Sequence, residues 1–119
     1  MFDDQSPIYR QIAQRIKDDI LSGVLREDAQ VMSTNQYAAA YRINPATAAK
    51  GLHELLDEGI LYKRRGIGMF VSPDAREKLR QQHRDRFFID VVEPMIAQAQ
   101  TIGIGLEEVI EHIQQKKRA

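Results

Sequence analysis

INPATAAKGLHELLDEGILYKRRGIGMFV (residues 43–71) contains a change from helical to extended spacing of its apolar residues. Asn44 is suited to cap a helix, and Pro45 is suited to its first position, where the missing N–H costs no hydrogen bond. An apolar stripe follows at helical spacing and consists of Leu52, Leu55 and Leu56. Gly59 is a typical stop signal, so we expect a helix between Asn44 and Gly59.

After Gly59 the apolar residues alternate with a period of two, which favours strands. The two expected faces hold Ile60, Tyr62 and Phe70 on one side and Leu61 and Val71 on the other. Gly66-Ile67-Gly68 supplies a turn between them. The stretch 60–72 is thus predicted to be a β-hairpin. Its first strand and tip carry three consecutive cations, Lys63, Arg64 and Arg65.

A first helix is predicted near the N-terminus. Ser6 is expected to cap this helix and Pro7 to occupy its first position. Isoleucines recur at every fourth position up to Ile20, which indicates one buried face. Ser22-Gly23 is expected to end the helix.

A second helix is predicted over 33–41, because Ser33 and Gln36 have the spacing of a capping box. About three residues separate this helix from the one that begins at Asn44, which is the outline of a helix-turn-helix. With the hairpin behind it, the region 1–72 is predicted to be a winged helix-turn-helix domain.

Beyond Ser72-Pro73 the chain is predicted to be helical to its end. Apolar residues form a wide stripe along a long helix, and Leu79 extends this stripe backward. Pro94 removes one backbone hydrogen bond, so it is expected either to kink or to break the helix. Gly103 is expected to close it.

A last helix is predicted to start near Gly105, where Ile104 and Val109 have the spacing of a hydrophobic staple. Two helices in the region 73–119 can hardly enclose a core, so their apolar faces are expected to meet a second copy of the chain. The expected dimer interface comprises Phe87, Phe88, Val91, Val92, Met95, Ile96, Val109, Ile110 and Ile113. Whether part of this stripe lines a small effector pocket is left open. The predicted fold class is mainly α with one small β-hairpin.

Composition limits the classes of function. Lys plus Arg and Asp plus Glu number 17 each, so net charge alone gives no support to nucleic-acid binding. Cysteine is absent, which excludes disulfides and thiolate chemistry. The acidic stretch 1–9 has no long apolar run, and no window reaches the roughly 18 apolar residues of a membrane span. We therefore expect a soluble cytoplasmic protein without a secretory signal.

No catalytic, cofactor or metal site is predicted. The three histidines are too scattered along the chain to suggest metal ligands. Glu54, Asp57 and Glu58 lie at helical spacing beside leucines, which favours an exposed face over acid–base chemistry. Gly66-Ile67-Gly68 lacks the third glycine and the following helix of a phosphate-binding loop.

A basic hairpin behind a helix-turn-helix indicates DNA binding. The third helix would enter the major groove, where the Thr47 hydroxyl meets phosphate and Lys50 reaches phosphate or guanine. Ala46 lets the backbone approach the groove and can touch a thymine methyl. The arginines of the hairpin would lie in or over the minor groove. The contacts expected from this arrangement are Asn44, Ala46, Thr47, Lys50, Lys63, Arg64, Arg65 and Gly66. A module of the same fold that binds a protein, without specific DNA binding, is the alternative.

The stretches SPIYRQIAQRIKDDILSGVL (6–25) and INPATAAK…GILYKRRGIGMFV (43–71) resemble the DNA-binding domain of the GntR family of bacterial transcription regulators. The short helical tail resembles that of the YtrA-type subgroup, in which the tail serves dimerisation. The resemblance implies a homodimeric repressor of a two-fold symmetric, inverted-repeat operator, often one that controls transporter genes. It places phosphate and base contacts near Ser33, Asn35, Thr47, Lys50, Arg65 and Gly66. It leaves open whether a small-molecule effector binds.

Three departures from the family's usual pattern accompany this resemblance. The run 31–35 replaces Leu-Pro-Ser-x-Arg, so that Asn35 stands where an arginine contact is common. Glu27-Asp28 replaces the usual Pro-Gly turn. Ala49 stands where many members outside the YtrA-type subgroup place an arginine, whereas Lys50 matches the basic residue common within it. One bidentate arginine is worth roughly 1–3 kcal/mol of base discrimination, so the departures bear on the operator sequence and leave the fold intact.

Overall fold

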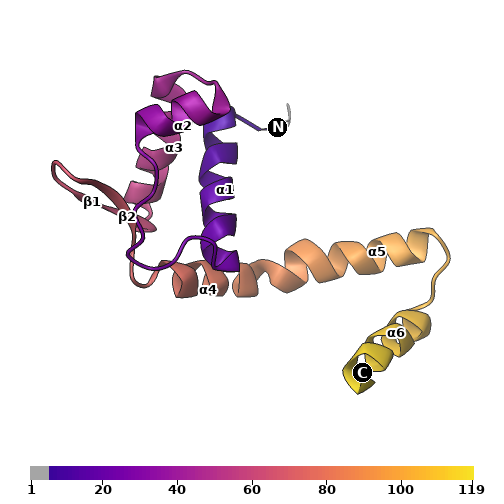
Figure 1. Cartoon of the computed structure of the whole chain (residues 1–119). Coiled ribbons are helices and arrows are strands. Elements are labelled where there is room, and N and C mark those ends of the chain that lie inside the picture. The colour runs from indigo at the N-terminus through magenta and orange to yellow at the C-terminus, as the bar shows by residue number, and fades with distance from the viewer. Residues whose placement is uncertain (1–5) are drawn as a thin grey trace. The chain divides into compact units, whose positions relative to one another are not determined.

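The computed structural model describes residues 6–119, and the part of the N-terminal stretch over residues 1–5, in which no secretory signal is expected, lies outside them. The chain divides into two compact units, one that ends at Arg80 and one that covers Gln81–Ala119. The elements, labelled in Figure 1, are α1 (Ile8–Ser22), α2 (Thr34–Tyr41), α3 (Pro45–Asp57), β1 (Leu61–Arg64), β2 (Gly68–Val71), α4 (Ala75–Phe87), the π-helical turn η1 (Phe88–Val92), α5 (Glu93–Thr101) and α6 (Leu106–Arg118). Within the described residues, none of these helices has the length and apolarity that crossing a membrane requires.

Helix α1 follows the isoleucine repeat and ends at Ser22 as predicted. The residues of the repeat that lie in the core are Ile12, Ile16 and Ile20, each 1% exposed. The prediction that Ser6 caps this helix is wrong, because Pro7 occupies the N-cap position itself with an extended ψ of 144°. Ser6 therefore lies one residue too early to cap, and its carbonyl oxygen accepts a hydrogen bond from Gln11 Nε2 at 2.8 Å.

Both predicted caps of the helix-turn-helix are confirmed. At the start of α2, Gln36 N donates to Ser33 Oγ at 3.1 Å and Ser33 N donates to Gln36 Oε1 at 2.7 Å, which closes the capping box. At the start of α3, Ala46 N donates to Asn44 Oδ1 at 2.8 Å, and Pro45 is the first helical residue. Each cap satisfies N–H groups that a helix terminus leaves without partners inside the helix. The starts of both helices are therefore fixed by local sequence.

The core of the first unit forms where α1 packs against α3 (Figure 1). The residues of α3 that face α1 and α2 are almost fully buried and include Ala48, Leu52 and Leu55. Gly51 lies at the closest approach, because a Cβ there would stand 2.8 Å from the carbonyl oxygen of Tyr9. The absence of a side chain at this position thus sets the distance between the two helices.

Two sequence predictions about side-chain exposure are corrected by this core. Leu79, which was expected to extend the C-terminal stripe, is 1% exposed and belongs to the core of the first unit together with Ala75. Glu58, expected on an exposed face, is half-buried, and its Oε1 lies 3.1 Å from Lys17 Nζ of α1. Lys78 Nζ also donates to the Glu58 carbonyl at 2.6 Å. Because α1, α3 and α4 pack together here, Leu79 and Glu58 have neighbours on other helices that the pattern of a single helix does not indicate.

The hairpin has the two predicted faces, but its turn lies earlier than expected, because Gly68 already belongs to β2 and pairs with Arg64. Tyr62 pairs with Phe70 across the two strands, and their rings stack with centroids 5.6 Å apart. Leu61 pairs with Val71, and both side chains are buried. Ile60 precedes β1 and is fully buried with them. The inner end of the hairpin is therefore anchored in the core, and its outer end carries the cations.

A third extended segment lies beside β2 and was not predicted. Val31 N donates to the Met69 carbonyl at 2.9 Å, and Val71 N donates to the Ala29 carbonyl at 2.9 Å. Gln30 forms an isolated bridge opposite Phe70. The polar link between α1 and α2 therefore extends the two-stranded sheet by short antiparallel pairing.

In the second unit, Pro94 does not end the helix, but the backbone hydrogen bonds just before it follow the π-helical pattern in place of the α-helical one. The turn η1 ends two residues before Pro94, at Val92, and the Glu93 N–H bonds to the Phe88 carbonyl five residues earlier. Proline lacks an N–H, and its ring presses on the carbonyl four residues before it, so a widened turn at this place relieves the crowding. Helix α5 then ends at Thr101, close to Gly103.

Helix α6 begins as predicted, with Gly105 at its N-cap. Ile104 and Val109, the expected hydrophobic staple, are both half-buried and line the same cavity. Ala99 of α5 is the one residue of this unit that is classed as buried among those the structure describes. The second unit thus has almost no interior of its own.

We expect Gly51→Ala to lower the free energy of unfolding by about 1–3 kcal/mol, because the new methyl group would meet backbone and not a movable side chain. Alanine is the better helix former by roughly 1 kcal/mol, so helix propensity alone predicts the opposite sign. Urea denaturation measures the change. Gly105→Ala is the control, because nothing lies within 4 Å of its added Cβ. Unchanged or greater stability of Gly51→Ala would show that α1 and α3 are less closely packed.

Candidate nucleic-acid interface

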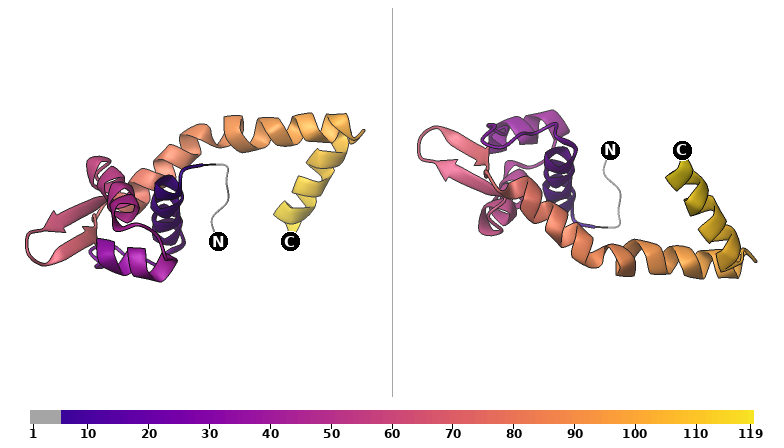
Figure 2. Two further views of the ribbon diagram at one scale, coloured as in Figure 1. Left: turned by 90° about the horizontal axis from the view of Figure 1, so that it is seen from above. Right: turned by 90° about the horizontal axis from the view of Figure 1, so that it is seen from below.

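The predicted DNA contacts lie on three segments of the first unit. Ser33 and Asn35 stand at the start of α2, and the first two turns of α3 hold the second group, namely Asn44, Ala46, Thr47 and Lys50. The third group occupies the outer end of the hairpin, namely Lys63, Arg64, Arg65 and Gly66. All ten are exposed except Thr47, which is half-buried. Figure 2 shows the hairpin of β1 and β2 extending away from α1, α2 and α3.

The starts of α2 and α3 present hydrogen-bond donors. The oxygen of Ser33 and the Oδ1 of Asn44 accept backbone N–H groups inside the helix caps. The hydroxyl hydrogen of Ser33 and the NH2 group of Asn44 are therefore the polar groups that these side chains can offer to a partner. Both stand at the positive end of a helix dipole, where phosphate oxygens are favoured.

Lys50 lies against an aromatic ring. Its Nζ is 4.2 Å from the centroid of the Tyr9 ring on α1. The guanidinium carbon of Arg10 lies over the same ring at 5.8 Å. These distances are within the range of a cation–π interaction, so the ammonium group of Lys50 has a preferred position on the surface.

The cations of the hairpin differ in their surroundings. Arg64 Cζ lies 5.3 Å from the Phe70 ring centroid, so this side chain runs along the hairpin. Arg65 is the second residue of the tip, where Ile67 N donates to the Arg64 carbonyl at 3.0 Å. Gly66 has a φ of +77°, which a tight turn of this kind requires and which glycine adopts without strain. Arg65 is therefore the cation that lies in the turn itself.

Two side chains from the segment before α2 hold the hairpin in place. The Tyr62 hydroxyl donates to Asp28 Oδ1 at 2.8 Å, and Gln30 Nε2 donates to the Ile67 carbonyl at 3.2 Å. Asp28 has a φ of +62°, in the left-handed region that aspartate tolerates better than most residues. Asp28 thus keeps the backbone in a turn and adds a contact to the hairpin.

Sequence reasoning did not predict the contacts of Tyr9 with Lys50, of Tyr62 with Asp28 and of Gln30 with Ile67. The Glu27-Asp28 departure was visible in the sequence and, because aspartate tolerates a left-handed turn, could have indicated Asp28. No local pattern links Tyr9 to Lys50 or Gln30 to Ile67, since these pairs are separated by about forty residues. Their roles depend on packing between elements.

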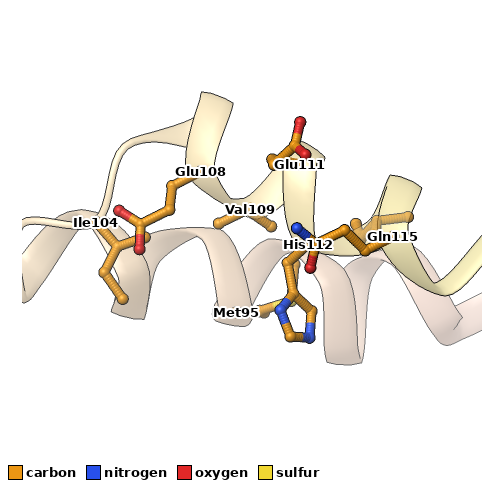
Figure 3. A pocket seen from close by; sticks show the side chains of 8 residues that line it. Met95, Ile104, Glu108, Val109, Glu111, His112 and Gln115 are labelled. Carbon is orange, nitrogen blue, oxygen red and sulfur yellow. The ribbon is translucent and has the colours of Figure 1, made fainter.

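The predicted dimer residues lie on four elements of the second unit. Phe87 ends α4, and the others follow in order: Phe88, Val91 and Val92 in η1, Met95 and Ile96 in α5, and Val109, Ile110 and Ile113 in α6. Most are exposed, with Phe88 at 67% and Val91 at 51%. Figure 3 shows Met95 of α5 and Val109 of α6 at a shared cavity of about 450 Å³, which Ile113 also lines. The structure therefore leaves a large apolar surface uncovered on one chain.

Ligands for a metal ion do not gather on the part of the chain that the structure covers. Among residues 6–119, no group of three or more His, Asp or Glu side chains has the arrangement that could hold an ion.

The helix-turn-helix with capped helices, followed by a braced basic hairpin, defines a winged helix-turn-helix domain. Residues 8–71 match the family described as bacterial regulatory proteins, gntR family. The chain belongs to this family, and it is a DNA-binding transcription regulator. The match covers the segment in which the family motifs were predicted.

Similarity to individual relatives extends beyond the DNA-binding domain. The transcriptional repressor YtrA of Bacillus subtilis is 30% identical over 92% of this chain and 84% of its own length. The transcriptional repressor NagR of the same organism is 37% identical over 63% of this chain, which spans only 31% of NagR. The resemblance to the YtrA type is thus confirmed, since that match includes the C-terminal helices.

Solved structures confirm the fold class. A GntR family regulator from Listeria monocytogenes superposes with a TM-score of 0.76 at 28% identity, covering 96% of this chain and 98% of that one. The DNA-binding domain of AraR, solved in complex with an operator, superposes with a TM-score of 0.56 at 25% identity over 60% of this chain and 93% of that one. The first comparison covers both units, and the second covers the winged helix-turn-helix.

We expect Tyr62 to titrate above the ordinary tyrosine pKa of 10.0, because its hydroxyl donates a hydrogen bond to Asp28. The folded state then holds the proton more tightly than the unfolded chain. The resulting stability is complete below pH 10.0 and is lost as the pH rises through the raised pKa.

Absorbance titration of tyrosinate in the wild type and in Tyr62→Phe measures this pKa by difference. The difference is needed because burial raises the pKa of Tyr37 as well, to about 12. Asp28→Asn, which removes the carboxylate, should lower the Tyr62 pKa. A Tyr62 pKa that does not respond to Asp28→Asn would mean that the hydrogen bond is absent in solution.

Proposed function

We propose that this protein is a homodimeric repressor that binds an inverted-repeat DNA operator and acts in the cytoplasm without catalytic activity. Residues 1–72 serve as the DNA-binding domain and residues 73–119 as the dimerisation region. The observation that carries the proposal is the combination of a capped α3 with a basic hairpin whose tip holds Arg65. The relatives YtrA and NagR, which are both named repressors, support the sign of regulation.

On the operator, the start of α3 enters the major groove. There Lys50 reaches guanine or phosphate, and the polar groups of Ser33, Asn44 and Thr47 meet phosphate. The hairpin tip lies in or over the minor groove, where arginine is attracted to narrow, negative geometry. The AraR complex supports this use of the fold, since that domain was solved with an operator. Asn35 offers a neutral side chain where the family commonly has arginine, so the preferred bases differ.

The uncovered apolar surface of the second unit supports dimerisation. Large side chains such as Phe88 and Val91 are more than half exposed on one chain. Monomeric proteins rarely expose so many contiguous apolar side chains, and a two-fold partner would present the same surface in return. Two winged domains held in this way read two half-sites, which accounts for an inverted repeat. Transporter genes are the proposed targets, as in the YtrA-type subgroup.

Binding of a protein partner through α3 and the hairpin is the alternative function. DNA binding and protein binding differ in how the affinity responds to salt, because DNA binding releases counterions from each neutralised phosphate. In-vitro selection from random duplexes, with full-length protein, supplies the operator on which the salt dependence of affinity is tested. An enriched inverted repeat supports the proposal, and the lack of any enriched sequence would favour the protein-binding alternative.

We expect Arg65→Ala to weaken binding to the selected operator and to reduce the salt slope by about one, because one phosphate-neutralising cation is lost. Fluorescence anisotropy over a range of salt concentrations measures both quantities. Arg84→Ala is the control, since Arg84 is also an exposed arginine and belongs to α4, outside the sequence of the hairpin. If Arg65→Ala and Arg84→Ala give the same slope, the hairpin tip does not contact DNA.

We expect Val91→Asp to yield folded monomers. Val91 is 51% exposed on one chain, so a carboxylate there is tolerated by the single chain but would be buried without a partner in the dimer. Sedimentation velocity gives the oligomeric state, and circular dichroism checks the helical content. Ala97→Asp, at an exposed position on the opposite face of α5, is the matched control and should remain dimeric. An intact Val91→Asp dimer would place the interface elsewhere.

A further inference from the structure

Tyr9 on α1 and Lys50 on α3 form a cation–π contact between the two helices. The Lys50 ammonium nitrogen lies 4.2 Å from the ring centroid, and Lys50 is exposed while Tyr9 is half-buried. The contact joins the first turn of α1 to the second turn of α3. It thus lies where the α1–α3 core reaches the surface that faces DNA.

Backbone packing fixes the point from which the Tyr9 side chain extends. The Tyr9 carbonyl oxygen would stand only 2.8 Å from a Cβ at Gly51, the residue directly after Lys50. The same Cβ would also lie 3.6 Å from Ile12, which is 1% exposed. Because α1 and α3 meet this closely beside Lys50, the Tyr9 backbone cannot move away from the lysine without a shift of the helices.

We propose that Tyr9 is a positioning residue for DNA recognition, which holds the Lys50 side chain in the orientation it uses on the operator. This inference rests on the proposed function. A free lysine loses rotamer freedom when it binds, and this loss weakens affinity. A ring that restrains the side chain beforehand reduces the loss. An ammonium group over a ring keeps N–H donors directed away from it, so a base or phosphate can bind while the ring contact persists.

The ring face carries this effect, and the hydroxyl does not. Tyr9→Phe should therefore bind the selected operator within about twofold of the wild type, whereas Tyr9→Leu should bind about 3- to 10-fold more weakly. Arg10 lies over the same ring at 5.8 Å and also loses its contact in Tyr9→Leu. A double-mutant cycle with Lys50 separates the two cations.

The experiment is operator binding by full-length wild type, Tyr9→Leu, Lys50→Met and the double variant, with Tyr9→Phe as the conservative control. We expect Tyr9→Leu to change affinity by less than about twofold once Lys50 is replaced, because the restrained cation is then absent. An equal loss in both backgrounds would overturn the inference, since Tyr9 would then act independently of Lys50. A loss in Tyr9→Phe as large as in Tyr9→Leu would also overturn it and would assign the effect to the hydroxyl.

A second measurement on the free protein does not depend on DNA. Ring currents should displace the NMR signals of the Lys50 side-chain methylene nearest the ammonium group in the wild type and in Tyr9→Phe, and the displacement should vanish in Tyr9→Leu. Unperturbed Lys50 signals in the wild type would overturn the inference. If the wild type selects no duplex, the proposed function fails and the positioning role fails with it. If it binds its operator and the cycle shows no coupling, only the role of Tyr9 fails.

Discussion

The close packing of α1 against α3 at Gly51 is the constraint on which the rest of the first unit depends. Since no side chain separates Gly51 from the Tyr9 backbone, the two helices approach closely enough to bury Leu52 and Leu55 in one continuous core. The same approach fixes which residues of α3 remain outside. Lys50, the neighbour of Gly51, is left exposed at the edge of the contact. Core packing and the display of the recognition surface are therefore consequences of one backbone distance.

The sequence predicted the parts of the fold that depend on local interactions. The capping box at Ser33, the Asn44 cap and the two faces of the hairpin each involve residues a few positions apart or directly paired, and all three were confirmed. The features that were missed join distant residues. The pairing of the 28–31 segment with β2 and the ion pair between Lys17 and Glu58 leave no periodic signal in the chain. Ser6 failed as a cap for a different reason, since Pro7 displaced the helix start by one residue.

Asp28 shows how a departure from the family pattern changes what a turn does. A Pro-Gly turn at this place would adopt the left-handed conformation without strain but would carry no side chain toward the hairpin. Asp28 adopts a φ of +62°, and its carboxylate accepts the Tyr62 hydroxyl of β1. The steric cost of the backbone is offset by a hydrogen bond to a charged acceptor. The orientation of the basic hairpin is then tied to the link before α2, which also supplies Gln30.

Because the chain has no net charge, the exact positions of its individual cations matter more for DNA binding. A chain with equal numbers of acidic and basic residues has little long-range attraction for DNA, so sequence-independent binding contributes less than it does in a basic protein. Under the proposed function, affinity then depends on a few cations in defined places and on the simultaneous use of two half-sites by a dimer. Lys50 over Tyr9 and Arg64 over Phe70 are both restrained by aromatic rings before any partner arrives. Preorganised cations on a neutral protein favour discrimination between sites over general adhesion to DNA.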